Sequence, residues 1–574
     1  MPVMRLLPPL DRRGLLLHLL AVLAYAAMLL YGPLSEGTQE ERIYTSVLSG
    51  GFCLLLLCLS RRVAFSLIAT AGLFSLLLAS SVLKMIYMTT PLLAPDLVYF
   101  ANTDTVEVVL RYPLLLIASF VGLVLLPVSL VGIWRIDKPQ LLPAWRPRWR
   151  RLLLAVVAAA SLFALVRAMS PQGPFAAVYA KGMWAAMNDK SYLTDFFISF
   201  YSTQIQPPVL VEGAAGRQVW NEQVATVGDP RQRPDIFVVL EESTFDPTML
   251  EVCKLPLCKR KLFQDDKRTR AHGYLQVHTW GGGTWTSEFA FLTSMAHVLF
   301  GNAGLYAPFN LAPRVAYSLP KVMKENGYRT LVIYPMSGSF INARNAYSYY
   351  GFDEFHDGSE NGLGWESTDF DLLKVFDRVI AQERKEFPDT PLFVFMLTLH
   401  QHGPHMTPLG QLPSPYNKPL FPKKLDAWLN LNMSNYLSRL EQSEQAMSEL
   451  EQKLFTGSRR TVLMHFGDHQ PSFDGAINAM EKRVPKGVTD PSKITYYMLK
   501  SNFPLRKKVD FELLDIIYLG SLLLDVADLR KDDFYEANTL LRDRCQGRYF
   551  DCTDPKMLES YHDYVYGQLG ALKD

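Results

Sequence analysis

Long apolar stretches dominate the first 170 residues of the chain. Five of them stand out, at about 14–32, 43–60, 63–84, 113–134 and 150–170. Most are long enough to cross the ~30 Å core of a bilayer at ~1.5 Å per residue, although the second is short and contains two glycines. A cleavable signal peptide would explain only the first stretch. Residues 1–170 are therefore predicted to form a bundle of five transmembrane helices.

Charged residues in the short loops indicate how these helices cross the membrane. Every second loop is basic, and the basic residues are Arg5, Arg12, Arg13, Arg61, Arg62, Arg135, Lys138, Arg146, Arg148, Arg150 and Arg151. The other loops carry mainly acidic residues. Basic loops stay in the cytoplasm, so five crossings leave the rest of the chain outside it. The sequence predicts a multi-pass protein of the bacterial inner membrane with a periplasmic C-terminal domain.

Residues 171–234 are predicted to be an interfacial or juxtamembrane linker between the membrane helices and that domain. Its aromatic residues are expected either at the lipid headgroup level or in a packed linker helix: Trp184, Phe196, Phe197, Phe200 and Tyr201. A second moderately apolar segment, Thr89–Tyr112, is predicted to lie on the outer membrane face.

From Asp235 onward, short apolar runs alternate with helical stretches. Four near-continuous apolar runs are predicted strands: 235–240 (DIFVVL), 330–334 (TLVIY), 392–399 (LFVFMLTL) and 461–466 (TVLMHF). Strands that are apolar on both faces are typical of a parallel sheet covered by helices on both sides. Helical patterns fill the gaps, notably at 425–455 and 511–529. Residues 235–574 are therefore predicted to form a doubly wound α/β domain.

Composition excludes one class of partner and suggests a compartment. The formal net charge is +2, and no block of lysines and arginines is present, so nothing points to nucleic acid. Four cysteines form two close pairs, Cys253/Cys258 and Cys545/Cys552. Outside the cytoplasm such pairs favour disulfides, with free thiols or a four-cysteine metal site as the alternatives.

Acidic and imidazole side chains follow three of the predicted strands. Glu241-Glu242-Ser243 follows the first, the segment 400–405 (HQHGPH) the third, and Gly467-Asp468-His469 the fourth. Ligands of open α/β sheets bind at the carboxyl ends of the strands, so these side chains are expected to meet at one edge. Such a set suits a divalent metal ion, Zn²⁺ or Mn²⁺. Taken singly, a strand-end Glu is often a helix cap, and an Asp-His pair is more often structural.

Three glycines, Gly281-Gly282-Gly283, precede Thr284 and a run with helical character. Glycines let the backbone approach a ligand closely, although such a run is usually only a turn. The start of a helix offers free N–H groups and a positive dipole end to an anion. A threonine at this position, beside a metal ion, is predicted to be a nucleophile toward phosphate.

At these residues the chain resembles the alkaline phosphatase/sulfatase superfamily. More closely it is similar to the membrane branch of lipoteichoic acid synthases, phosphoglycerol transferases and phosphoethanolamine transferases, whose plan is five spans plus an external catalytic domain. The resemblance implies that Glu242, Asp468 and His469 bind the metal ion together with the nucleophile Thr284. The rival positions are Glu241 for the carboxylate and Thr286 for the nucleophile.

The resemblance implies further site residues. His402, in Gln401-His402-Gly403-Pro404, matches a phosphate-contacting histidine. Arg344, upstream of Gly351-Phe352-Asp353, matches a phosphate clamp, with an ordinary surface arginine as the alternative. Supporting roles around the site, or simple packing, are expected for three more residues: Glu288, His400 and His405.

The implied activity is transfer of a phospholipid headgroup phosphate, phosphoglycerol or phosphoethanolamine, onto a glycan or glycolipid through a phosphothreonine. The chain has no C-x-P-x-R or S-x-P-x-R sequence, the sulfatase site of formylglycine formation, which argues against a sulfatase. The alternatives are a phosphodiesterase or phosphatase that uses the same site with water, and a non-catalytic sensor or assembly protein.

Overall fold

The computed structural model describes residues 12–88, 91–99, 110, 113–139, 148–179, 191–201, 205–217, 219–220, 233–473, 475–504 and 511–573. The chain separates into two compact units, Met1–Gln204 and Ile205–Asp574. Residues of the predicted linker, 171–234, therefore belong to both units. Trp184 and most of the predicted outer segment at 89–112 lie outside the described residues.

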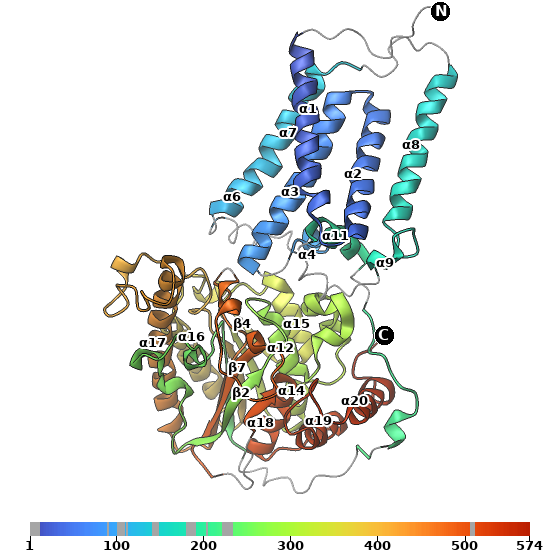
Figure 1. The fold of residues 1–574 in the computed structure, drawn as a ribbon. Helices are drawn as coiled ribbons and strands as arrows, with labels where there is room; N and C mark the ends of the chain where they lie inside the picture. The colour runs from blue at the N-terminus through green and yellow to red at the C-terminus, as the bar shows by residue number, and fades with distance from the viewer. Residues whose placement is uncertain are drawn as a thin grey trace, which may run out of the picture. The chain divides into compact units, whose positions relative to one another are not determined.

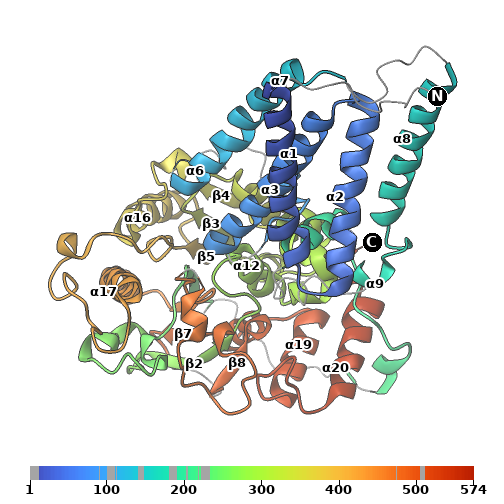
Figure 2. The same cartoon turned by 45° about the horizontal axis from the view of Figure 1, so that its top comes forward.

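Long apolar helices build the first unit. They are α1 (Arg12–Tyr31), α2 (Gln39–Ser60), α3 (Val63–Met88), α6 (Pro113–Phe120), α7 (Leu126–Ile136) and α8 (Arg148–Ala168). Helix α1 packs along α3, and α2 packs along α3 and α8 (Figure 1, Figure 2). Many large apolar residues of these helices are exposed, Leu19, Leu153 and Phe163 among them.

Within the described residues, four segments are long and apolar enough to cross a membrane. They are Arg12–Ser35, Gln39–Ser60, Val63–Met85 and Leu116–Ile136. The apolar part of α8 is shorter, Leu152–Ala168, because three arginines occupy the start of that helix. The count of five spans therefore stays a prediction, although each predicted stretch is helical.

Helices α6 and α7 are joined by a π-helical turn at Val121–Leu125. Pro127, close behind this turn, has no N–H to donate, and its ring clashes with the carbonyl four residues earlier. A single wider turn relieves that clash, so the helix can continue through the proline.

Short α-helices in the described part of the first unit are α4 (Asp96–Tyr99), α9 (Ala176–Tyr179) and α11 (Tyr192–Ile198). The aromatic residues predicted for the linker differ in their surroundings. Phe196 is buried, and Phe197 packs against Phe74 of α3. Phe200 and Tyr201, just after α11, are exposed. Part of this group therefore packs as a linker helix does, and the two exposed rings also contact Phe196 and Tyr179.

A single mixed sheet organises the second unit (Figure 1). Its strands are β1 (Asp235–Glu241), β2 (Thr269–Gln276), β3 (Arg329–Tyr334), β4 (Glu354–Asp357), β5 (Leu392–Leu397), β6 (Thr461–Gly467), β7 (Ile494–Ser501) and β8 (Leu513–Asp515). Their order is β4-β3-β5-β1-β6-β7-β2-β8. Strand β7 pairs antiparallel with both neighbours, and every other pairing is parallel.

All four predicted strands are present, as β1, β3, β5 and β6, and they lie side by side in the parallel half of the sheet. The four predicted strands are parallel to one another, as expected, and the sheet as a whole is mixed because β7 runs against its neighbours. The predicted helical run at 511–529 is corrected. It begins with the short strand β8 and becomes helix α18 only at Leu519.

Helices cover both faces of the sheet, as the doubly wound prediction required. They are α12 (Thr284–Thr293), α13 (Ala307–Asn310), α14 (Leu319–Glu325), α15 (Ala343–Tyr350), α16 (Asp369–Glu386), α17 (Ala427–Phe455), α18 (Leu519–Ala527), α19 (Asp533–Arg544) and α20 (Pro555–His562). Alternate side chains of β1 enter different cores. Val238 and Leu240 pack with residues of α12, α15 and α18, whereas Phe237 and Val239 pack with α16 and α17.

Both predicted disulfides are formed, Cys253–Cys258 and Cys545–Cys552. Each closes a short loop of the second unit. The first loop follows the end of β1, and the second follows α19. The other two cysteines, Cys53 and Cys58, are unbonded and lie in α2.

Candidate metal centre

Strand β1 ends in two glutamates with different surroundings. Glu241 continues the strand alternation into the core beneath α16 and α17. There its Oε1 lies 3.5 Å from Nδ1 of His465, which in turn lies 2.9 Å from the Tyr496 hydroxyl. Glu242 lies one residue past the strand, at the carboxyl edge of the sheet. The alternation along β1 therefore turns Glu241 away from the edge and leaves Glu242 there.

A strained residue, Ser243, fixes Glu242 in place. Its φ of 49° lies in the left-handed region, which costs a non-glycine residue on the order of 1 kcal/mol. Two hydrogen bonds hold it there: its N–H donates to Oδ1 of Asp468 (2.7 Å), and its hydroxyl donates to Oε1 of Glu242 (2.9 Å). Ser243 thus connects the end of β1 to the end of β6.

Strand β6 presents Asp468 and His469 at the same edge. Gly467 allows this, because a Cβ there would lie only 1.8 Å from the carbonyl oxygen of Thr244. Oδ1 of Asp468 also accepts the N–H of His469 (2.7 Å). Nδ1 of His469 lies 2.9 Å from the carbonyl oxygen of Gln470, to which it must donate. That bond leaves Nε2 of His469 as the ring atom able to bind a cation.

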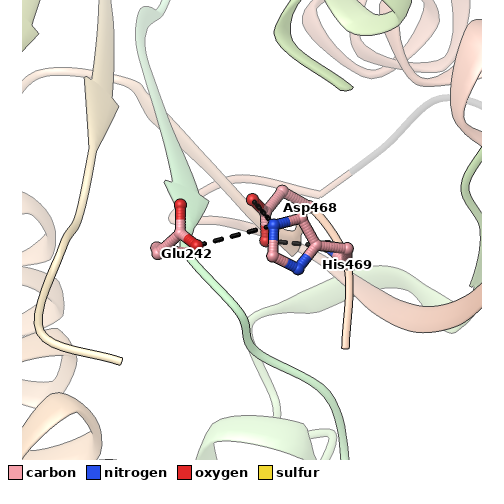
Figure 3. A group of neighbouring side chains, drawn as sticks. All are labelled: Glu242, Asp468 and His469. Atoms are coloured by element: carbon pink, nitrogen blue, oxygen red, sulfur yellow. Dashed lines mark hydrogen bonds and ion pairs between the residues drawn. The ribbon is translucent and has the colours of Figure 1, made fainter. Parts of the chain in front are cut away.

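Glu242, Asp468 and His469 converge, although more than 220 residues separate the first from the other two (Figure 3). One ligand atom of each lies within 4.8 Å of the others, and all three residues are buried. Nε2 of His469 is 3.1 Å from Oδ2 of Asp468 and 3.5 Å from Oε1 of Glu242. The sheet edge thus gathers the three predicted metal ligands into one group.

Thr284 joins this group from the start of α12. Gly281 and Gly283 have φ values of 64° and 81°, and Gly283 caps the helix in a left-handed conformation. The Thr284 hydroxyl donates to Oε2 of Glu242 (2.7 Å) and lies 3.3 Å from Nε2 of His469. Thr284 is thus the first residue of α12, at the positive end of the helix dipole, where an anion is favoured.

The rival threonine has a different contact. The Thr286 hydroxyl donates to the carbonyl oxygen of Gly283 (2.7 Å), inside its own helical turn, and its residue is buried. This hydrogen bond lies within the first turn of α12 and stabilises the turn at Gly283. Of the two candidate nucleophiles, the structure brings Thr284 to the carboxylates.

Burial and like charge act together on the site. Burial, and then the charge of Glu242, raise the pKa of Asp468 well above its usual value. Burial opposes ionisation of Glu242 as well, yet His469 and His402 hold its pKa below the usual value. Burial lowers the pKa of His469, which favours its neutral, ligating form. Two adjacent buried carboxylates of this kind call for a cation.

The donor set fits a divalent metal ion. It comprises two carboxylates, one imidazole Nε2 and one hydroxyl, which is a mixed O and N set. Among the described residues, no lysine or arginine forms an ion pair with Glu242 or Asp468, whose only ionic partner is His469. Protein cations therefore do not balance this acidic pair, and Glu242, Asp468, His469 and Thr284 could hold the ion.

His402 lies on the loop after β5, close enough for its charge to act on Glu242 and His469. Its Nδ1 donates to the carbonyl oxygen of Gly403 (2.7 Å), which leaves Nε2 free to take a proton. Arg439 of α17 holds this loop by donating to the carbonyl oxygens of His402 (2.8 Å) and Pro404 (3.0 Å).

The expected supporting residues have separate roles. His400, on the loop after β5, interacts with the buried carboxyl of Asp369 at the start of α16. His405 is buried against the rings of Tyr436 and Phe473, which is a packing role. Glu288 accepts a hydrogen bond from the Tyr347 hydroxyl (2.8 Å). Burial, and then the charge of Glu242, raise the pKa of Glu288 to about 7.

Arg344 is engaged elsewhere. It lies in the first turn of α15, and its Nη2 donates to Oδ2 of Asp357 (3.0 Å) and Oε1 of Glu360 (2.7 Å). Its guanidinium also stacks over the ring of Phe355. Among the described residues, no recorded contact joins Arg344 to the four residues of the metal group. The structure brings the predicted metal ligands and Thr284 together, and it leaves Arg344 paired with acids.

Three residues that support the site were not predicted from the sequence: Ser243, Arg439 and Trp365. The ring of Trp365 lies 4.9 Å from that of His402. Ser243 could have been found, since it follows the ligand directly in a turn. Arg439 and Trp365 reach the site from distant helices and loops, and no local pattern marks them.

Together, fold and site define an α/β domain with a candidate metal centre at the carboxyl edge of its sheet. The sulfatase family model matches residues 234–509, a range that contains all four residues of the metal group. This part of the chain is therefore similar to the sulfatase family, in agreement with the superfamily resemblance.

Two curated relatives match part of the chain. An uncharacterised protein of Haemophilus influenzae is 28% identical over 352 residues, which are 59% of this chain and 62% of that protein. A Rhizobium meliloti protein named for the modification of cyclic β-1,2-glucan is 26% identical over 280 residues, which are 46% and 39% of the two chains. The chain thus spans less than two thirds of the length of either relative.

Two solved structures are similar in fold. The phosphoglycerol transferase of Streptococcus pyogenes, in complex with sn-glycerol-1-phosphate, is 18% identical and covers 63% of this chain and 95% of its own, with a TM-score of 0.49. The integral membrane lipooligosaccharide phosphoethanolamine transferase A of Neisseria meningitidis is 14% identical. That match covers 88% of this chain and 95% of its own, also with a TM-score of 0.49.

Proposed function

We propose that the protein is a membrane-bound, metal-dependent transferase that moves a phospholipid headgroup phosphate onto a glycan or glycolipid through a phosphothreonine at Thr284. The observation that carries this proposal is the 2.7 Å hydrogen bond from the Thr284 hydroxyl to Glu242, inside the group formed with Asp468 and His469. A hydroxyl held among buried acids at a helix start is poised for attack on phosphorus.

In the first half-reaction, the Thr284 oxygen attacks the phosphorus of phosphatidylglycerol or phosphatidylethanolamine. The bond from phosphorus to the diacylglycerol oxygen breaks, and diacylglycerol leaves with a proton. Glu242 orients the hydroxyl through its hydrogen bond, and the N–H groups at the start of α12 face the phosphate oxygens. A bound Zn²⁺ or Mn²⁺ would lower the hydroxyl pKa and offset charge on the phosphate.

In the second half-reaction, an acceptor hydroxyl attacks the phosphorus on Thr284, and the threonine oxygen regains its proton. His402 is assigned to proton transfer and phosphate contact, because its Nδ1 bond to Gly403 leaves Nε2 unprotonated in the neutral ring. Arg344 is assigned to holding the turn at Asp357 and Glu360, with which it pairs.

Donor and acceptor are inferred from different features. The apolar helices of the first unit favour a donor drawn from the bilayer. A glycan acceptor is favoured by the Rhizobium relative, which is named for the modification of a cyclic glucan. Alternation of basic and acidic loops supports a periplasmic site on a bacterial inner membrane.

Release of diacylglycerol from labelled phospholipid by the purified full chain, supplied with Mn²⁺ or Zn²⁺, tests the proposal. Thr284→Ala should lower release by at least about 1,000-fold, as loss of a nucleophile does. Thr286→Ala should keep most activity, because that hydroxyl serves only a local turn. Full activity of Thr284→Ala would refute the assignment. Free phosphoglycerol or phosphoethanolamine as the sole product, with a glycan present, would mark a hydrolase.

A further inference from the structure

A surface hollow lies between the loop after β4 and the start of α16. Its volume is about 750 Å³, which falls in the range of ~300–1,000 Å³ typical of small-molecule sites. The residues that matter for its chemistry are Asn361, Trp365, Glu366, Asp371, Lys374 and Arg378.

The wall of this hollow is held in shape by its own hydrogen bonds. Arg344 pairs with Asp357 and Glu360 at the base of the loop, and the Leu363 N–H donates to the carbonyl oxygen of Gly358 (2.7 Å). At the other end, Thr368 caps α16 in a reciprocal bond with Asp371. A wall fixed in this way loses little conformational entropy when a ligand binds.

Trp365 connects the hollow to the metal centre. Its indole ring lies 4.9 Å from the His402 ring, and the charge of His402 acts on Glu242 and His469. The ring also meets the edge of Phe340. Trp365 would therefore be the side chain between a ligand in the hollow and His402, the residue assigned to proton transfer.

The charges that line the hollow balance. Glu366 and Asp371 are matched by Lys374 and Arg378, and Lys374 pairs with Asp371 at 2.8 Å. A hollow with no net charge does not favour an anionic headgroup, which needs a surplus of cations. Donors and acceptors next to a partly exposed indole suit a neutral ligand with many hydroxyls.

We propose that this hollow is the acceptor subsite, and that it binds a neutral oligosaccharide whose hydroxyl reaches the phosphorus on Thr284 past His402. The inference rests on the proposed function for its catalytic meaning, but sugar binding in the hollow can be measured without any turnover. Trp365 packs against the sugar ring, and Arg378 and its polar neighbours hydrogen-bond the hydroxyls.

Calorimetric titration of the full chain in detergent with neutral oligosaccharides tests the proposal. The panel runs from glucose disaccharides to cyclic β-1,2-glucan. Arg378→Ala should weaken binding by about tenfold, which is the loss of one hydrogen bond to a charged group. Trp365→Leu should weaken it at least as much. The control is Lys385→Ala, which removes an exposed cation from the same helix outside the hollow and should bind as the wild type does.

Two results would overturn the acceptor subsite: no member of the panel binds the wild-type chain, or Arg378→Ala and Trp365→Leu both bind with wild-type affinity. Diacylglycerol release by the wild-type chain, measured without oligosaccharide, reports separately on the donor reaction. If the wild-type chain released no diacylglycerol but bound sugar in a way that depends on Arg378, the proposed function would be refuted and the sugar subsite would be supported.

Discussion

The Thr284 hydroxyl donates a 2.7 Å hydrogen bond to Oε2 of Glu242, a residue 42 positions earlier in the chain. The contact joins a helix start to a strand end, and the same hydroxyl lies 3.3 Å from Nε2 of His469. Gly283 caps the helix, so the Thr284 hydroxyl is directed to the strand-end carboxylate. The position of this hydroxyl among three potential ligands is what gives the site its chemistry.

Substitution of the two neighbouring glutamates should separate their roles. Glu242→Gln should weaken metal binding by at least about 100-fold, since it removes a charged ligand. Glu241→Gln should keep the metal, because burial raises the pKa of Glu241 well above its usual value and an amide resembles the neutral acid. Metal content of the purified variants, measured by mass spectrometry, is the readout. Equal loss of metal in both would contradict the assignment of Glu242 alone.

Arg439 should act on catalysis through His402. Arg439→Gln removes the donors that hold the carbonyl oxygens of His402 and Pro404, so turnover should fall by about tenfold or more. Metal content and melting temperature should stay near those of the wild type, and Arg439→Lys should recover part of the rate.

The matched control for Arg439 is Lys453→Gln on the same helix, where the lysine pairs with exposed acids. Its steady-state rate should equal that of the wild type. If Arg439→Gln instead lowered the melting temperature substantially together with the turnover rate, a general structural role for Arg439 would explain the lower rate.

His562 should make the protein sensitive to acid. Burial lowers its pKa to about 4, among the rings of Tyr549, Tyr561 and Tyr566, and its Nε2 lies 2.6 Å from the Tyr549 hydroxyl. Between the ordinary histidine pKa of ~6.5 and about 4, only the unfolded chain takes up this proton. Stability is therefore lost as pH falls through that window, by on the order of 3 kcal/mol in all.

Urea midpoints of the full chain at pH values from 7 to 4 check the expectation. His562→Gln should show a shallower fall with decreasing pH than the wild type, whereas substitution of the exposed His272 should leave the slope unchanged. A wild-type slope in His562→Gln would show that other buried groups cause the acid sensitivity.

The parallel half of the sheet could be predicted because its strands are apolar on both faces. Runs such as Asp235–Leu240 and Leu392–Leu397 carry that signal without interruption. The other half could not, because β2 (Thr269–Gln276) is only partly buried and mixes polar with apolar residues. β8 is too short, at three residues, for any periodicity to show.

The site was predictable where its residues follow the strands directly. Glu242, Asp468 and His469 stand just past β1 and β6, so the topology alone brings them together. Arg344 could not be placed, because its partners Asp357 and Glu360 lie on another strand and loop. Long-range pairings of this kind depend on tertiary packing, which local sequence does not encode.

The central claim is that Thr284 carries the transferred group, and mass spectrometry of the protein tests it most directly. The metal-loaded chain is mixed with phosphatidylglycerol or phosphatidylethanolamine without acceptor, quenched in acid and digested. The account predicts a glycerol phosphate or phosphoethanolamine adduct on the peptide that contains Thr284, localised to that residue and absent from Thr284→Ala. An unmodified Thr284 during active turnover, or an adduct on Thr286, would contradict it.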